Sequence, residues 1–207
     1  AEKEPELGGM LGHLHKLYPS MEDAARGLDQ IVNGVNSNKS INVLTSTVVK
    51  QVKGFIGNFE VAVEKTDGET MNFGVGTIIV ATGAVNLEPV GMYGYRESDN
   101  VMTQLQLEQL LKDGQLRQPE KVVMIQCVGS RTEERPNCSR ICCSVAVKNG
   151  LKIKEKNPDT KITILYRDIR TYGLMERYYT QARNAGVEFI QYELDAKPDL
   201  KVEGGAL

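Results

Sequence analysis

The chain has 207 residues and a formal net charge of −2 at pH 7; 41% of its residues are hydrophobic and 25% are charged. This length allows one large domain or two small ones, and the near-neutral charge gives no indication of nucleic-acid binding. No apolar run approaches the roughly 20 residues that a membrane helix needs, and no signal peptide opens the chain, so we expect a cytoplasmic protein without a membrane span.

The first elements in the chain are a helix and a group of short strands. Apolar residues recur at helical spacing in residues 16–36, after a candidate N-cap formed by Ser20 with Asp23 nearby. Residues 41–76 change to short runs rich in Val, Ile and Thr, which predict a small β-meander. Its turns lie at Gly54–Gly57 and Thr66–Glu69, and the second carries the Asp-Gly signal of a hairpin.

The next stretch predicts a buried strand and then a connection between two lobes. The run TIIVATGA, Thr77–Ala84, has the composition of a buried parallel strand that ends in small residues. A stretch rich in Gly and Pro follows, and VMTQLQLEQLLKDG then indicates one helix. We place the boundary between the lobes after residue 118.

The second lobe alternates strands and helices from Lys121 onward. Its strands are expected at Val122–Ile125, Lys161–Asp168 and Val187–Tyr192, an order that predicts a parallel sheet. A nicotinamide-binding lobe would carry G-x-G-x-x-G directly after its first strand, whereas Gln126–Ser130 contains a single glycine. The pattern therefore argues against NAD(P) binding. Residues 197–207 look like a hairpin that lacks its second strand.

All four cysteines lie between the first strand of this lobe and the helix that follows it. They are Cys127, Cys138, Cys142 and Cys143, spaced C-x10-C-x3-C-C. Thiolates suit an iron–sulfur cluster, structural zinc is the second interpretation, and ordinary reduced thiols are the third. The spacing matches neither zinc ribbons nor bacterial ferredoxins, so these interpretations stay open. The last two cysteines lie near a predicted helix N-terminus, whose dipole favours thiolates.

The cysteine run QCVGSRTEERPNCSRICC and the later run ILYRDIRTYG resemble the A-subunit family of the heterodisulfide reductases. The similarity extends from EKEPELGGMLG at the start to AGVEFIQ near the end. It implies an α/β, Rossmann-like FAD/NAD(P)-binding fold with two lobes, truncated at both ends. Residues 1–118 would form a partial FAD-binding lobe with a β-meander and a crossover helix. Residues 119–207 would form an NAD(P)-binding-like lobe that carries the cysteines.

The resemblance also assigns cofactor contacts. The ligands implied for a [4Fe–4S] cluster are Cys127, Cys138, Cys142 and Cys143. The residues implied for FAD are Glu2, Gly8, Gly9, Ala81, Thr82 and Gly83; Glu2 would accept hydrogen bonds from the ribose and the glycines would allow close approach of the nucleotide. The first glycine-rich turn would lie before Ala1, so we expect this chain to bind FAD weakly or not at all. No catalytic proton-transfer residue is predicted.

The implied function is that of an oxidoreductase subunit, of which this chain would be a central fragment that need not be active alone. It would pass electrons between FAD and [4Fe–4S] clusters, towards disulfide-reducing partner subunits. The expected partners are other heterodisulfide reductase-type subunits and electron-donor proteins, with self-association of the fragment as a further expectation. Two alternatives remain: a thiol redox protein similar to the pyridine-nucleotide-disulfide oxidoreductases, and a docking scaffold with structural zinc.

Overall fold

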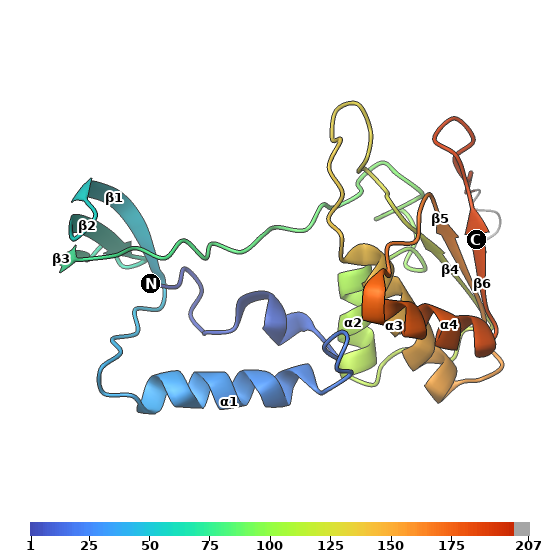
Figure 1. Ribbon diagram of the computed structural model, residues 1–207, viewed down its shortest axis with the longest axis horizontal. Coiled ribbons are helices and arrows are strands. Elements are labelled where there is room, and N and C mark those ends of the chain that lie inside the picture. Colours follow the sequence, from blue (N-terminus) through green and yellow to red (C-terminus); the bar gives the residue numbers. More distant parts are fainter. Residues whose placement is uncertain (201–207) are drawn as a thin grey trace. The chain divides into compact units, whose positions relative to one another are not determined.

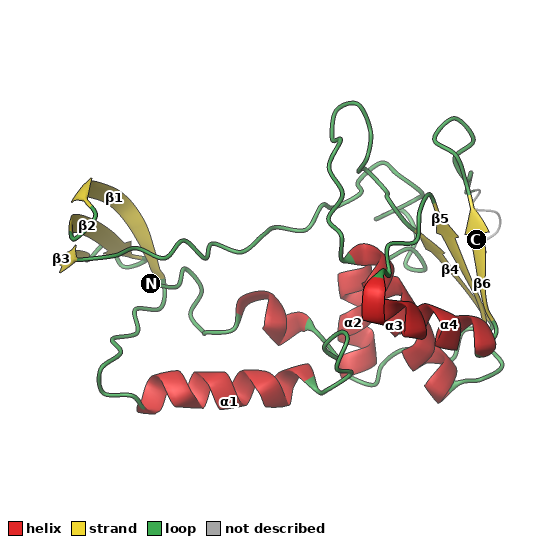
Figure 2. Cartoon of the chain, in the orientation of Figure 1, coloured by secondary structure: helices red, strands yellow, loops and turns green. Residues whose placement is uncertain are grey.

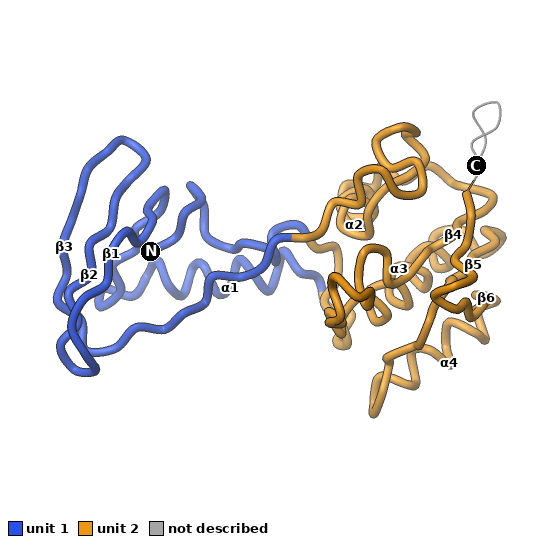
Figure 3. The backbone as a smooth tube through the Cα atoms, turned by 90° about the horizontal axis from the view of Figure 1, so that it is seen from above, with its two compact units in different colours: residues 1–13, 23–85 blue, residues 14–22, 86–207 orange. Residues whose placement is uncertain are grey.

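The computed structural model of the protein describes residues 1–200, which fall into two compact units (Figure 3). The first unit contains residues 1–13 and 23–85, and the second contains residues 14–22 and the chain from residue 86. This division differs from the predicted boundary after residue 118, because the helix before that point packs into the core of the second unit. The hairpin predicted for 197–207 lies largely outside the described residues.

The helices of the first unit are the short 3-10 helix η1 (Gly9–His13) and α1 (Ala24–Ser37) (Figure 1). The predicted amphipathic helix is therefore present in residues 24–37. Of the two candidate capping residues, Asp23 is the N-cap, and its side chain accepts a hydrogen bond from the Arg26 N–H at 3.2 Å. This contact satisfies one of the free N–H groups of the first turn.

The sheet of the first unit is an antiparallel meander of β1 (Thr47–Phe55), β2 (Asn58–Lys65) and β3 (Thr70–Val75). Both predicted turns are present. Phe55 pairs with Asn58 across the first turn, and in the second turn the Asp67 carboxylate accepts the Glu69 N–H at 3.0 Å while Gly68 has φ +90°. These residue types suit tight turns because aspartate bonds its own backbone and glycine adopts positive φ without strain.

The buried strand predicted at Thr77–Ala84 does not form, and that prediction was wrong. The segment is coil (Figure 1), and Ile79 and Val80 are 88% and 80% exposed. A parallel strand is stable only when neighbouring strands satisfy its N–H and C=O groups. No described strand pairs with this segment, so its apolar composition alone does not produce a strand.

The second unit has the predicted α/β order, with helices packed on a parallel sheet (Figure 2). Its elements are α2 (Gln104–Lys112), β4 (Lys121–Ile125), α3 (Cys142–Lys156), β5 (Lys161–Tyr166), η2 (Gly173–Met175), α4 (Glu176–Asn184) and β6 (Val187–Gln191). The strands pair in the order β4-β5-β6. Thr103 and Gln106 form a capping box at the start of α2.

The core of this unit lies between the sheet and its helices. The buried residues of one continuous cluster are Leu107, Leu111, Met124, Ala146, Val147, Ile153, Ile162, Ile164, Tyr178, Ala182 and Val187. They come from all three strands and from α2, α3 and α4, so burial of apolar surface fixes the helices on the sheet. Because the three strands are parallel, their carboxyl ends meet at one edge, where open α/β sheets place ligands.

Candidate functional site

Cys127 lies at this edge, two residues beyond the end of β4. The residue before it, Gln126, is buried, and its carbonyl accepts a hydrogen bond from the Tyr192 hydroxyl beyond β6. Cys127 has φ +61°, an uncommon conformation for a residue other than glycine. Its sulfur lies 4.0 Å from Nη1 of Arg131. The end of β4 thus places one thiol beside a guanidinium group at the edge of the sheet.

Cys142 and Cys143 are the first two residues of α3, in line with the prediction that they lie near a helix N-terminus. The N-cap, Ile141, makes no side-chain capping bond, so the first-turn N–H groups are open to another acceptor. Hydrogen bonds from the Cys143 thiol, the Ser139 hydroxyl and the N–H groups of Cys142 and Cys143 lower the pKa of Cys142 to about 6, against the effect of burial. The same contact with Cys142, together with burial, raises the pKa of Cys143.

In metal-free protein, iodoacetamide is expected to modify Cys142 before Cys143 at neutral pH, because the thiolate is the nucleophile. The rate should fall as the pH is lowered through the pKa of Cys142, about 6. Tandem mass spectrometry of the tryptic peptide ICCSVAVK locates the label. Ser139→Ala removes a hydroxyl 3.2 Å from the Cys142 sulfur and should move the profile to higher pH. Equal labelling of both cysteines would contradict this assignment.

The fourth cysteine, Cys138, lies on the long connection between β4 and α3. Its sulfur accepts the N–H of Arg140 at 3.3 Å, whereas the Cys143 sulfur lies 3.4 Å from the Asp168 carbonyl oxygen. Cys143 is also within electrostatic range of Cys142 and Cys127. Within residues 1–200, however, no three Cys, His, Asp or Glu side chains lie close enough together to hold a metal ion. The set of four cluster ligands therefore stays a prediction.

Two charged residues after β5 bind this connection to the rest of the unit. The Asp168 carboxylate pairs with the Arg131 guanidinium at 2.6 Å, and Nη1 of Arg167 donates to the Arg131 carbonyl at 2.7 Å. Neither Arg167 nor Asp168 is among the site residues predicted from the sequence. Their position at the carboxyl end of a predicted parallel strand was the one signal that could have identified them, since such ends converge with the cysteine loop.

The residues predicted to contact FAD all belong to the first unit. The Glu2 carboxylate accepts the Glu4 N–H at 3.0 Å, and Gly8, with φ +132°, faces α1 so closely that a Cβ would lie 2.9 Å from Leu28 Cδ2. Gly9 begins η1. Ala81, Thr82 and Gly83 are exposed coil. Gly8 thus has a packing reason for being glycine, and the role of these residues in FAD binding stays a prediction.

Membrane insertion of a helix finds no support in the described residues. None of their helices combines the length and the apolar character that a membrane span needs. The cytoplasmic location stays a prediction.

Similarity to curated proteins covers almost the whole chain. The A-subunit of the H2:CoB-CoM heterodisulfide,ferredoxin reductase of Methanothermobacter thermautotrophicus is 28% identical over 294 positions, which cover 96% of the chain and 45% of that protein. The iron-sulfur A-subunit of the CoB–CoM heterodisulfide reductase of Methanocaldococcus jannaschii is 29% identical, covering 92% of the chain and 43% of that protein. A shorter match, 40% identical over 139 positions, is to the A-subunit of the ferredoxin/F420H2-dependent CoB-CoM heterodisulfide reductase of Methanosarcina acetivorans; it covers 59% of the chain and 18% of that protein.

These matches also show what the chain lacks. It spans less than half the length of the first two relatives, and the aligned stretch of 294 positions exceeds the 207 residues of the chain. The relatives therefore carry internal segments without a counterpart here. No family model matches the chain.

Two solved structures share a distant likeness with the chain. L-proline dehydrogenase from P. horikoshii has 14% identity and a TM-score of 0.43, covering 99% of the chain and 31% of that protein. Bacillithiol disulfide reductase from Bacillus cereus has 17% identity and a TM-score of 0.47, covering 92% of the chain and 58% of that protein.

Proposed function

The chain is a relative of the A-subunits of heterodisulfide reductases, and on this premise we propose that it takes part in electron transfer between FAD and a [4Fe–4S] cluster. The observation that carries the proposal is the position of the cysteines. The only four thiols of the chain lie on the connection from β4 to α3, at the ligand-binding edge of a parallel sheet. The direction of transfer, towards disulfide-reducing partners, rests on the names of the relatives.

The donor chemistry of this connection suits an iron–sulfur cluster. Cys127, Cys142 and Cys143 come from a strand end and a helix start that the core holds in place, and Cys138 lies on the loop between them. A bound cluster would supply one-electron redox chemistry. The chain would supply the thiolates and, through Arg131 beside Cys127, a positive charge that offsets theirs. Such charges and burial tune the potential of a cluster.

Flavin binding by this chain is proposed to be weak or absent. The residues that would meet FAD are Glu2, Gly8, Gly9, Ala81, Thr82 and Gly83. The Glu2 carboxylate is engaged by the Glu4 N–H, and the segment that carries Ala81–Gly83 does not join a sheet that would hold its backbone against a cofactor. The proposed partners are electron-donor proteins and other subunits of heterodisulfide reductase type, and self-association would cover apolar surface exposed in the 77–90 segment.

The test is an anaerobic preparation of the chain, with a visible spectrum and counts of iron, acid-labile sulfide, zinc and flavin. We expect iron and sulfide in equal amounts, little zinc and less than stoichiometric flavin. Zinc without sulfide would favour the docking scaffold, and titratable thiols without any metal would favour the thiol redox protein. Either result would overturn the proposal that the cysteines bind a cluster. Stoichiometric flavin would overturn the proposal that FAD binding is weak or absent.

A further inference from the structure

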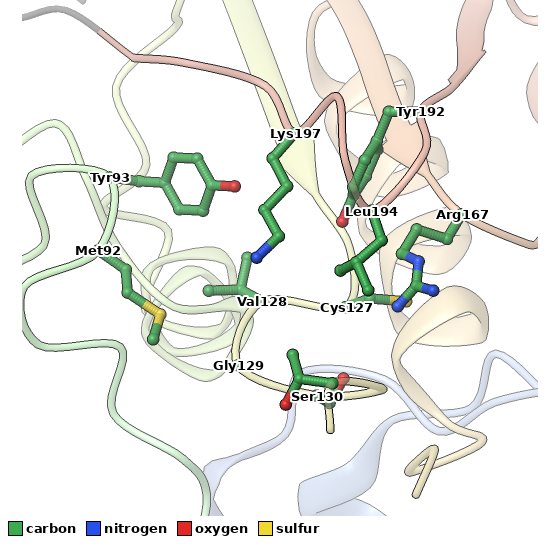
Figure 4. A pocket seen from close by; sticks show the side chains of 11 residues that line it. Met92, Tyr93, Cys127, Val128, Gly129, Ser130, Arg167, Tyr192, Leu194 and Lys197 are labelled. Atoms are coloured by element: carbon green, nitrogen blue, oxygen red, sulfur yellow. The ribbon is translucent and has the colours of Figure 1, made fainter. Parts of the chain in front are cut away.

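A cavity of about 260 Å³ opens at the carboxyl edge of the β4-β5-β6 sheet (Figure 4). Each strand contributes to its lining: Cys127–Ser130 follow β4, Arg167 follows β5 and Tyr192 follows β6. Tyr93 and Lys197 complete it from segments far apart in the sequence. All of these residues belong to the second unit, so the cavity forms within one compact body.

The charge of this lining is positive. Arg167 and Lys197 are the cations among the lining residues, and no carboxylate lines the cavity. The nearby Asp168 carboxylate pairs with Arg131 at 2.6 Å, and Asp199, within electrostatic range of Tyr93, is not part of the lining. Among the described residues Lys197 has no ion-pair partner. Two cations without an acidic partner in the lining favour a negatively charged occupant.

Hydrogen-bond donors accompany these cations. Nη1 of Arg167 is bound to the Arg131 carbonyl at 2.7 Å, which fixes the guanidinium group at the edge of the cavity while its other N–H groups remain for a ligand. Tyr93, Ser130 and Thr132, each of which carries a hydroxyl, are also among the lining residues. Arg131, rather than Arg167, is the arginine directed at the Cys127 sulfur. Arg167 and Lys197 are not engaged by that contact, so their charge faces the cavity, whose lining also includes the proposed cluster ligand Cys127.

The size of the cavity and the turn beneath it favour a ligand smaller than a dinucleotide. Its volume is below the roughly 300–1,000 Å³ of sites for drug-sized ligands. Ser130 N–H donates to the Cys127 carbonyl at 3.2 Å, closing a turn with Gly129 at φ +65°. A Cβ on Gly129 would lie 2.4 Å from Leu87 Cδ2, so this glycine serves packing rather than a pyrophosphate. We propose that the cavity binds a small phosphate group, held by Arg167 and Lys197, as free phosphate or as the monoester of a small metabolite.

The test measures ³¹P line broadening of inorganic phosphate and of glycerol phosphate in titrations with the full chain at constant ionic strength. We expect saturable binding that weakens at least about tenfold in Lys197→Ala, because a charge-assisted hydrogen bond is lost. If glycerol phosphate binds more tightly than inorganic phosphate, the phosphate group comes from a monoester; the reverse order identifies free phosphate. Lys121→Ala, at the opposite end of β4, is the matched control and should bind like the unchanged protein.

Arg167→Ala should weaken binding as well, but its bond to Arg131 also supports the loop, so Lys197→Ala is the decisive variant. Unchanged binding in Lys197→Ala, or loss of binding when chloride replaces the inert salt at equal ionic strength, would overturn the inference. Tighter binding of NADP⁺ than of either phosphate would overturn it too. Iron and sulfide counts on the same sample separate this result from the proposed function, since phosphate binding does not require the cluster.

Discussion

Serine in place of any one of Cys127, Cys138, Cys142 and Cys143 is expected to remove the iron and sulfide of the anaerobically prepared chain. A serine hydroxyl is a harder and far less acidic donor than a thiol, and [4Fe–4S] clusters are held mainly by thiolates. The chain has no fifth cysteine to substitute for a lost ligand. The visible spectrum and the iron and sulfide counts of the four variants, each compared with the unchanged chain, measure the effect.

A control separates lost ligation from lost folding. Ser139→Ala changes a neighbour in the same loop, whose hydroxyl lies 3.2 Å from the Cys142 sulfur, and it should retain the cluster. Circular dichroism of all variants checks that the helices remain, which matters most for Cys143, because that residue is buried. Full iron content in Cys138→Ser would remove Cys138 from the ligand set, and full content in all four variants would refute the cluster site.

The second large effect is expected at a buried ion pair, where Glu108→Gln should lower the free energy of unfolding by about 3–5 kcal/mol. Lys148 Nζ on α3 pairs with the Glu108 carboxylate on α2, and the two side chains are 2% and 1% exposed. Nζ also donates to the Lys16 carbonyl at 2.8 Å, and the carboxylate accepts the His15 N–H at 2.9 Å. Glutamine keeps the shape but leaves the lysine charge buried without a counter-charge. Urea unfolding followed by circular dichroism measures the loss.

The pair Lys152–Glu155 on the same helix, whose carboxylate is exposed, gives the matched control. Glu155 is 61% exposed, so Glu155→Gln should cost only about 0–1 kcal/mol. Replacing both buried partners, as in Glu108→Leu with Lys148→Met, should recover most of the loss, because neither charge is then left alone. A Glu108→Gln variant as stable as Glu155→Gln would show that the buried pair contributes little. Because the chain has two units, the unfolding curve is fitted for two transitions.

Much of the local structure could be predicted from sequence because it depends on near neighbours. The Asp67-Gly68 turn, the helix over residues 24–37 and the strand–helix order after Lys121 all follow from residue types a few positions apart. The start of α3 at Cys142 was also within reach, since the apolar pattern that follows it sets the helix. These features place the cysteine connection at the carboxyl end of β4.

Prediction from the sequence was less successful where contacts between residues far apart in the chain decide the structure. The run Thr77–Ala84 has the composition of a buried strand, but composition cannot supply the neighbouring strands that would satisfy its backbone, and the segment remains coil. The predicted lobe boundary after residue 118 gave α2 to the first lobe, whereas α2 lies in the second compact unit, which resumes at residue 86. The burial of Leu107 and Leu111 against the second sheet settles that choice only in three dimensions.

The sequence by itself determined the α/β character of the second unit, its turns, and the gathering of every thiol on one loop, because hydrophobic period, turn residues and chain order are local properties. The tertiary structure alone decided that Glu108 meets Lys148, that Arg167 meets the Arg131 carbonyl, and that Arg167 and Lys197 line one cavity. Each of these pairs is separated by 30 or more residues, and only the packing of helices on the sheet brings such partners within bonding distance or around one cavity.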